Sequence, residues 1–201
     1  MGDRSNTDAD LGALRSELRS RRRAIPERAA AAASEAVAGP IRLLMALLGA
    51  RRVAASIPTD GEIDVLAHLV PEAENGRVEI ALPVVVDEAT MVFARWAPGE
   101  PLAANRFDIP EPERPDHIAV ADLELILVPL VAFDDRGNRV GRGRGYYDRA
   151  LAPVRSGPER GRPALIGVAH EVQRVPRLAA RPHDVALDAV LTPAGLFLPE
   201  R

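Results

Sequence analysis

A nearly continuous run of apolar residues at positions 123–131 dictates the type of sheet that this chain can form. The run has the length of one strand, and a strand that is apolar at successive positions must be covered on both faces. Sheets of this kind are mostly parallel and carry helices on both sides. Residues 163–169 and 185–191 are further strand-like segments after the run. The pattern therefore predicts an α/β fold with a mostly parallel sheet covered by helices.

Apolar spacing and turn residues divide the rest of the chain into shorter elements. A first helix is indicated by apolar residues at helical spacing: Leu11, Leu14, Leu18 and Ile25. Further helices are expected at residues 26–33, 41–48 and 62–70, with a break at Gly39-Pro40, and further strands at residues 52–57, 78–86 and 90–96. Repeated prolines predict a largely extended loop over residues 97–116. No repeat or linker is visible, so we expect one domain over residues 1–201.

The basic residues are all arginine, because the chain has 26 Lys+Arg and none of them is lysine. A lysine nucleophile and a lysine-dependent phosphate loop are therefore excluded. The lack of cysteine excludes disulfides, thiolate zinc sites and cysteine nucleophiles. The formal net charge of -3 argues against nucleic acid or a membrane surface as a partner. No signal peptide or spanning segment is recognisable, so we expect a cytoplasmic protein.

Residues 134–149 combine alternating glycines with arginines and follow the apolar run. Glycine lets the backbone approach a ligand closely, and Arg139, Arg142 and Arg144 offer cationic forks to phosphate or carboxylate oxygens. A helix expected to begin at Tyr146 adds free N–H groups. The segment predicts an anion-binding loop at the carboxyl end of a strand. A solvated surface loop and an RNA-contacting segment remain alternatives, and the acidic balance disfavours the second.

The same glycine-rich segment carries a family resemblance. The sequence GNRVGRGRGYYD at residues 137–148 resembles the signature of the 5-formyltetrahydrofolate cyclo-ligase family, also called methenyltetrahydrofolate synthetases. Further matches follow in the family's order: Leu14-Arg15, residues 61–64, 109–112, 123–133 and 168–173, His183-Asp184, and residues 188–193. The chain is therefore identified as a member of this family.

The resemblance implies a single three-layer α/β domain, in a fold that resembles the NagB/RpiA/CoA-transferase-like group. It implies a cyclo-ligase that converts 5-formyltetrahydrofolate to 5,10-methenyltetrahydrofolate, with ATP as co-substrate, Mg²⁺ as cofactor, and ADP and phosphate as products. The formyl oxygen attacks the γ-phosphate, and N10 of the folate then displaces phosphate from the activated carbon. Negative charge develops on the phosphoryl oxygens in this reaction, and arginine guanidinium groups and Mg²⁺ can neutralise it. The implied partners are these two small molecules, and the implied state is a monomer.

The resemblance also implies three groups of site residues. ATP is expected to contact Arg15, Arg139, Gly141, Arg142, Gly143, Arg144, Gly145, Tyr146 and Tyr147. The folate is expected to contact Ile57, Glu62, Arg142, Gly143, Arg144, Gly145 and Tyr146, of which Arg142, Arg144 and Tyr146 would be catalytic. Asp148 and Asp184 are expected to hold Mg²⁺ through carboxylate oxygens.

The acidic residues of this set have ordinary structural interpretations as well. Asp148 could form a salt bridge with Arg144 or Arg149, and Asp184 could be a turn residue after a proline. Glu62 could stabilise the first turn of its helix through the helix dipole. The ordered set of family matches favours the functional interpretation of all three.

One position departs from the family pattern. Family members carry a lysine one helical turn before Arg15, where this chain has Leu11. Side chains at this spacing share a helix face, so the family's two cations would reach the same phosphates. Arg19 or Arg4 could assist Arg15, which lies in a row with Arg19 and Arg22. The departure leaves three hypotheses: an active cyclo-ligase, a non-catalytic or altered folate- or nucleotide-binding paralogue, and an RNA-associated member of the fold.

Overall fold

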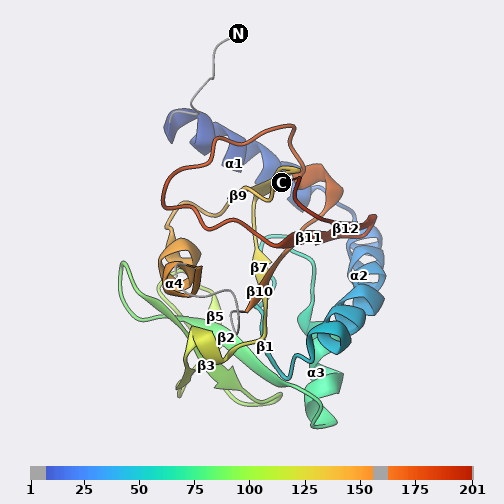
Figure 1. Cartoon of the computed structure of the whole chain (residues 1–201), viewed down its shortest axis with the longest axis vertical. Coiled ribbons are helices and arrows are strands. Elements are labelled where there is room, and N and C mark those ends of the chain that lie inside the picture. Colours follow the sequence, from blue (N-terminus) through green and yellow to red (C-terminus); the bar gives the residue numbers. More distant parts are fainter. Residues whose placement is uncertain (1–7, 156–162, 201) are drawn as a thin grey trace.

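The structure is a computed structural model that describes residues 8–155 and 163–200. Within these residues, an eight-stranded sheet runs through the centre in the order β12-β11-β10-β7-β1-β2-β3-β6 (Figure 1). The strands of this sheet are β1 (Arg52–Ala54), β2 (Glu79–Val85), β3 (Met91–Trp96), β6 (Asp116–Ile118), β7 (Leu125–Pro129), β10 (Ala164–Val168), β11 (Ala189–Thr192) and β12 (Gly195–Phe197). The five strands from β11 to β2 are parallel, and β12, β3 and β6 are antiparallel additions. The expected mostly parallel α/β sheet is confirmed.

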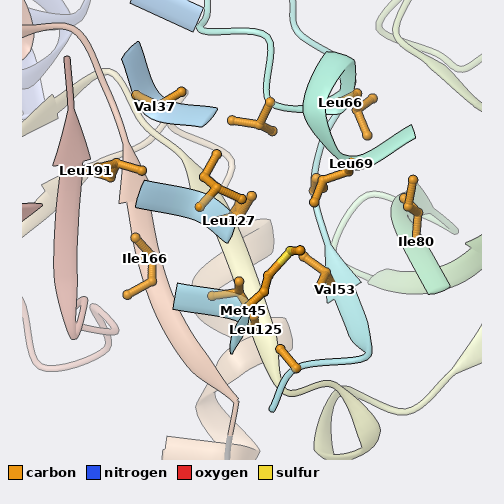
Figure 2. Packing of buried hydrophobic residues seen from close by; sticks show 14 of the residues in the cluster. Val37, Met45, Val53, Leu66, Leu69, Ile80, Leu125, Leu127, Ile166 and Leu191 are labelled. Atoms are coloured by element: carbon orange, nitrogen blue, oxygen red, sulfur yellow. The ribbon is translucent and has the colours of Figure 1, made fainter. Parts of the chain in front are cut away.

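Helices cover both faces of the sheet. In Figure 1, α2 (Glu27–Leu48) and α3 (Leu66–Glu74) lie to the right of the central strands and α4 (Tyr146–Arg155) lies to the left. Figure 2 shows Val37 and Met45 of α2 directed toward side chains of β7, among them Leu125. The intervening residue Ile126 belongs to the cluster on the opposite face, with Leu151 of α4. The apolar run is therefore buried on both faces, as its composition predicts.

The first helix packs away from the sheet. The leucines of α1 (Asp8–Arg23) form a cluster with the hairpin of β8 (Ala132–Phe133) and β9 (Arg139–Val140). This hairpin follows β7 and leads directly into the glycine-rich loop. The packing therefore fixes the arginine face of α1 beside that loop.

Several expected element boundaries were wrong. The break at Gly39-Pro40 is absent, because α2 runs through Pro40 with Val37, Ile41 and Met45 buried on either side. The burial of these side chains outweighs the lost hydrogen bond of an internal proline. The helix expected at residues 62–70 begins at Leu66, after the Asp64 side chain accepts a hydrogen bond from the amide of Ala67. The strand expected at residues 52–57 ends at Ala54, and residues 55–58 form a loop.

Local pairing adds elements that the sequence analysis did not anticipate. Residues 97–116 contain β4 (Leu102–Ala104), which pairs with β5 (Pro110–Pro112). The C-terminal strand was expected at residues 185–191 but is shorter, and β12 extends the sheet beyond it. Single-turn 3-10 helices occupy Val120–Asp122 and Glu171–Gln173.

Among the described helices, α2 is long and apolar enough to cross a membrane by length and composition. A core helix passes the same test, and the inner face of α2 is buried against the sheet. We therefore interpret α2 as a core helix.

Candidate active site

The glycine-rich loop lies between β9 and α4, with the helix beginning at Tyr146 as expected. Gly143 and Gly145 have φ angles of +100° and +67°, which glycine adopts without strain. A Cβ on Gly145 would lie 2.9 Å from the guanidinium of Arg149, and one on Gly143 would lie 3.3 Å from the Cζ of Arg15. The glycines therefore allow arginines to press against the loop from two sides.

A cavity of about 320 Å³ opens on one side of the loop. It lies at the carboxyl ends of the parallel strands, because Ser56 and Ile57 follow β1 and Leu130 follows β7. Apolar side chains such as Val85 and Met91 form much of its wall. Ligands of open α/β sheets bind at this edge, and the predicted position of the site agrees with that rule.

A paired carboxylate and guanidinium form the polar wall of this cavity. Arg142 Nη2 donates to Glu62 Oε1 at 3.0 Å and also to the Thr59 hydroxyl. Glu62 Oε2 accepts from the backbone N–H of Thr59 at 3.1 Å. Glu62 therefore lies in a loop and not in the first turn of a helix, which removes the helix-dipole interpretation. The structure brings Glu62 and Arg142 together across 80 residues of sequence.

Aromatic rings also line this cavity. The rings of Tyr146 and Phe107 meet edge to face with centroids 6.1 Å apart, and the Arg144 guanidinium lies 5.5 Å from the Phe107 ring centroid. The Tyr146 hydroxyl donates to the backbone oxygen of Asp87 at 3.1 Å. The sequence analysis missed Phe107. A single aromatic residue within a proline-rich loop was the available signal.

Buried or partly buried polar side chains also line this cavity, among them Arg139, Tyr147 and Asp148. Arg139 Nη2 donates to Asp148 Oδ1 at 2.7 Å, and only 4% of the Arg139 side chain is exposed. Arg139 Nε and the Tyr147 hydroxyl are buried without a hydrogen-bond partner among the described residues. Burial raises the pKa of Tyr147, so its hydroxyl stays protonated. Both atoms are buried within the wall of the cavity and are not exposed to its interior.

A second, wider cavity of about 1020 Å³ lies on the other side of the same loop. Arg144, Gly145 and Asp148 line both cavities, whereas Gly143 and Asp184 line only the second. The amide of Val185 donates to Asp148 Oδ1 at 3.1 Å, which brings the segment that contains Asp184 against α4. Asp184 Oδ2 accepts from the backbone N–H of Arg181, so Asp184 is also a turn residue. The two carboxylates thus share a cavity wall.

The comparisons with known proteins identify the family. A model of the 5-formyltetrahydrofolate cyclo-ligase family matches residues 7–193. The chain belongs to this family. A cyclo-ligase of Escherichia coli is 30% identical over 90% of this chain and 98% of its own length. The cyclo-ligase of Mycolicibacterium smegmatis is 33% identical over 90% of this chain and 92% of its own length.

Solved structures agree with this assignment. The 5,10-methenyltetrahydrofolate synthetase of Aquifex aeolicus is 29% identical, with a TM-score of 0.80 over 95% of this chain and 93% of that chain. A 5,10-methenyltetrahydrofolate synthetase of Mycoplasma pneumoniae is 21% identical with a TM-score of 0.72, which supports the fold alone. The chain therefore has the fold of the cyclo-ligase family as well as its sequence.

Most residues expected from the family pattern gather at the two cavities. The first is lined by Ile57, Glu62, Arg139, Gly141, Arg142, Arg144, Gly145, Tyr146, Tyr147 and Asp148, and the second by Gly143 and Asp184 in addition to the shared residues. Arg15 lies outside both linings but donates from Nε to the Gly141 oxygen at 2.9 Å. Arg15 therefore supports the loop from α1. The roles of these residues in binding stay predictions.

Leu11, where the cyclo-ligase family has lysine, is part of the core. It is 6% exposed and packs with Leu18, Val131 and Val140. Arg19 lines the first cavity and is held by Asp60 at 2.7 Å, and Arg4 lies outside the described residues. The Leu11 side chain therefore contributes to the packing of the core, whereas the lysine of the family pattern carries a charge.

Proposed function

We propose that this protein is an active 5-formyltetrahydrofolate cyclo-ligase that uses ATP and Mg²⁺ to form 5,10-methenyltetrahydrofolate. The proposal rests on two cavities, of about 320 Å³ and about 1020 Å³, that meet at the glycine-rich loop. A reaction between a folate and a nucleotide needs both substrates at one point, and the loop residues Arg144, Gly145 and Asp148 line both cavities. Holding two reactants in register supplies much of the rate acceleration of such a reaction.

The first cavity suits a reduced pterin. Its apolar wall and the rings of Phe107 and Tyr146 fit a flat ring system. Glu62 offers carboxylate oxygens that can accept hydrogen bonds from the ring N–H and amino groups. The volume of about 320 Å³ is at the lower end of the range for small-molecule sites.

The second cavity suits the polyphosphate of ATP. Arg144 and the positive-φ backbone of Gly143 and Gly145 offer charge and close backbone approach. The residues present fit a magnesium ion, because Mg²⁺ is commonly held by one or two carboxylates together with water and substrate phosphates. Asp148 and Asp184 would supply these carboxylates. Among the described residues, no group of three or more acidic, histidine or cysteine side chains could hold a metal ion alone. When bound, Mg²⁺ would neutralise charge on the transferred phosphoryl group.

The reaction that we propose is the one implied by the resemblance to the cyclo-ligase family. The formyl oxygen of the folate forms a bond to the γ-phosphorus of ATP and ADP leaves, which gives a phosphorylated imidate. N10 then attacks the activated carbon and gives up its proton to solvent, and phosphate leaves with the original formyl oxygen. Arg142 and Arg144 would orient the oxygen and stabilise the phosphoryl charge, and Tyr146 would hold the ring beside them. No side chain needs to act as a nucleophile.

The test is direct. Purified protein is mixed with 5-formyltetrahydrofolate, Mg²⁺ and ATP, and the methenyl product is followed by its absorbance. The proposal requires product that depends on both ATP and Mg²⁺, and an Arg142→Gln variant that is slower. A folded protein that forms no product, or forms it equally fast without ATP, would reject the proposal.

A second candidate is an altered paralogue that binds folate or nucleotide without turnover. Leu11 favours it, because the family's lysine charge is replaced by a buried apolar side chain. In the same assay, this candidate requires saturable binding of 5-formyltetrahydrofolate with no product.

We further propose, as expected from the sequence, a cytoplasmic monomer whose partners are these small molecules.

A further inference from the structure

Arg22 is the largest of the described side chains that are almost completely buried, with 1% of its surface exposed. A buried guanidinium has a large desolvation cost and is retained only where it is paired. Burial lowers the pKa of Arg22, and the charges of Glu62 and Asp60 act against this shift. Arg22 does not line either cavity. Its burial therefore needs an explanation other than direct contact with a ligand.

The donors of Arg22 join two walls of the first cavity. Nε donates to the backbone oxygen of Asp60 at 2.8 Å, and Nη2 donates to Asp60 Oδ2 at 3.0 Å. Nη1 donates to the backbone oxygen of Leu130, at the end of β7, at 3.1 Å. One planar side chain thus ties the loop after β1 to the loop after β7. Both loops line the cavity.

The turn that Arg22 holds has an unusual backbone. Asp60 and Gly61 have φ angles of +57° and +75°, and a positive φ is uncommon for residues other than glycine. A Cβ on Gly61 would lie 3.2 Å from the backbone oxygen of Arg22. On the other side, His170 Nε2 lies 3.2 Å from the Gly61 oxygen. The turn is therefore packed between α1 and the segment after β10.

Glu62 comes directly after this turn. Its Oε1 lies 3.6 Å from Arg22 Nη1 and 3.0 Å from Arg142 Nη2, so two guanidinium groups address the same oxygen. The Glu62 side chain is 11% exposed, and its backbone N–H donates to Thr59 at 3.1 Å. The direction of the carboxylate in the cavity thus depends on the turn and on both arginines.

We infer that Arg22, acting with Asp60, is a positioning residue that fixes the Glu62 carboxylate for recognition of the folate ring. The inference rests on the proposed function for the identity of the ligand. Arg22 acts on folate binding and leaves the nucleotide side unchanged, because Asp60, Glu62 and Leu130, which it contacts, belong to the two loops beside the first cavity and none of them lines the second. Arg19 and Arg23 also pair with Asp60, but their side chains are 40% and 51% exposed. Among the described residues, the guanidinium that also donates to the Leu130 oxygen after β7 is that of Arg22.

The test compares Arg22→Gln with Arg21→Gln, which removes a neighbouring arginine that is 59% exposed and whose ion pair within the described residues is with Glu17 on the same helix. For each protein, the KM for 5-formyltetrahydrofolate is measured at saturating ATP, and the KM for ATP at saturating folate. Arg22→Gln is expected to raise the folate KM about tenfold to a hundredfold, with the ATP KM unchanged. Arg21→Gln is expected to change neither. Equal changes in both KM values, or a lower melting temperature with unchanged folate KM, would overturn the inference.

If Arg22→Gln fails to fold, the folate KM is measured on Asp60→Asn in its place. Asparagine tolerates the left-handed backbone at this position, and the bonds of Arg22 to the two backbone oxygens can persist. We expect the same selective rise in folate KM, smaller in size, and a folate KM equal to that of the wild type would count against the inference.

Amide hydrogen exchange separates a failure of this inference from a failure of the proposed function. Faster exchange of the Glu62 amide in Arg22→Gln, with no change in Arg21→Gln, supports the positioning role without any turnover. Unchanged exchange contradicts it. Wild-type protein that makes no methenyl product rejects the proposed function, whereas the exchange result still decides whether Arg22 fixes the Glu62 turn.

Discussion

The two cavities beside the glycine-rich loop differ in how their polar groups are held. In the first, the Glu62 carboxylate is bonded to Arg142 and to the Thr59 amide, in a wall that combines apolar side chains with Arg139, Arg144 and Asp148. In the second, Asp184 is 30% exposed in its own turn, and the space is about three times as large. A narrow site with fixed groups selects a shape, whereas a wide charged site accepts an anion and its counter-ion. This difference supports our proposal that the first cavity recognises the folate and the second neutralises the charge of the nucleotide.

Asp148 belongs to both cavities, and its replacement is expected to have the largest effect. Asp148→Asn leaves the buried Arg139 guanidinium without the opposite charge of its partner, which should cost about 3 kcal/mol of unfolding free energy. It should also raise the Mg²⁺ concentration needed for half-maximal rate by about tenfold or more. Thermal unfolding and a Mg²⁺ titration of the rate measure the two effects.

Asp184→Asn is the matched comparison for Asp148→Asn. Because Asp184 is partly exposed and its nearest ion-pair partner in the described structure, His183, is 3.9 Å away, the melting temperature should not change. The Mg²⁺ requirement should still rise. Wild-type Mg²⁺ dependence in both variants would reject the metal assignment.

Leu11→Lys tests whether α1 presents a phosphate-facing position one turn before Arg15. Because Leu11 is packed against Val131 and Val140, lysine should lower the free energy of unfolding by about 2–4 kcal/mol. The KM for ATP should not fall. Leu11→Met, which keeps the volume, should cost less than about 1.5 kcal/mol. Tighter ATP binding at an unchanged melting temperature would mean that this face of α1 reaches the nucleotide.

Glu62→Gln should affect only the first cavity. Loss of the charge that Arg142 and Arg22 address should raise the folate KM about tenfold, which corresponds to about 1.4 kcal/mol, and leave the ATP KM unchanged. Glu17→Gln on the exposed face of α1 serves as the control, because Glu17 is 55% exposed. A parallel rise in both KM values would remove the distinction between the cavities.

The smallest expected effect is a pH dependence from Asp60. Partial burial favours a higher pKa for Asp60, but hydrogen bonds and charges from Arg19, Arg22 and Arg23 outweigh it and lower the pKa from 3.8 to about 2. A lowered folded-state pKa contributes stability that is present above the unfolded value and lost as the pH falls through the folded one. In acid unfolding, the stability difference between wild type and Asp60→Asn should stay constant above about pH 5 and shrink toward about pH 2. A difference that grows as the pH falls would contradict this assignment.

The sequence predicts those parts of the fold that depend on local patterns. The apolar strand β7, the hairpin strands β2 and β3, and the start of α4 at Tyr146 follow from periodicity and turn residues. The rule that proline ends a helix failed at Pro40, because burial of Ile41 and Met45 outweighs it. The strands of the β8–β9 hairpin are too short to show an alternating pattern of apolar residues. The hairpin depends on buried Asp134, whose carboxylate accepts hydrogen bonds from the backbone amides of Arg136 and Asn138.

The candidate site shows the same division. Its glycines, arginines and acids are adjacent in sequence or match a family signature, so they could be named in advance. Arg22 could not, because its role depends on Leu130, which is 108 residues away in the sequence. Phe107 reaches Tyr146 only through the folding of the proline-rich loop. Residues that act across long sequence separations leave no local signal.

We propose that the two substrates occupy different cavities that meet at one loop. Backbone amide shifts of the labelled protein, recorded with 5-formyltetrahydrofolate alone and with ATP and Mg²⁺ alone, test this directly. The folate should shift the amides of Ile57 and Glu62, the nucleotide should shift those of His183 and Asp184, and both should shift the glycine-rich loop. If both ligands shift the same amides, or if the nucleotide shifts Ile57 and Glu62, the assignment of the cavities is wrong.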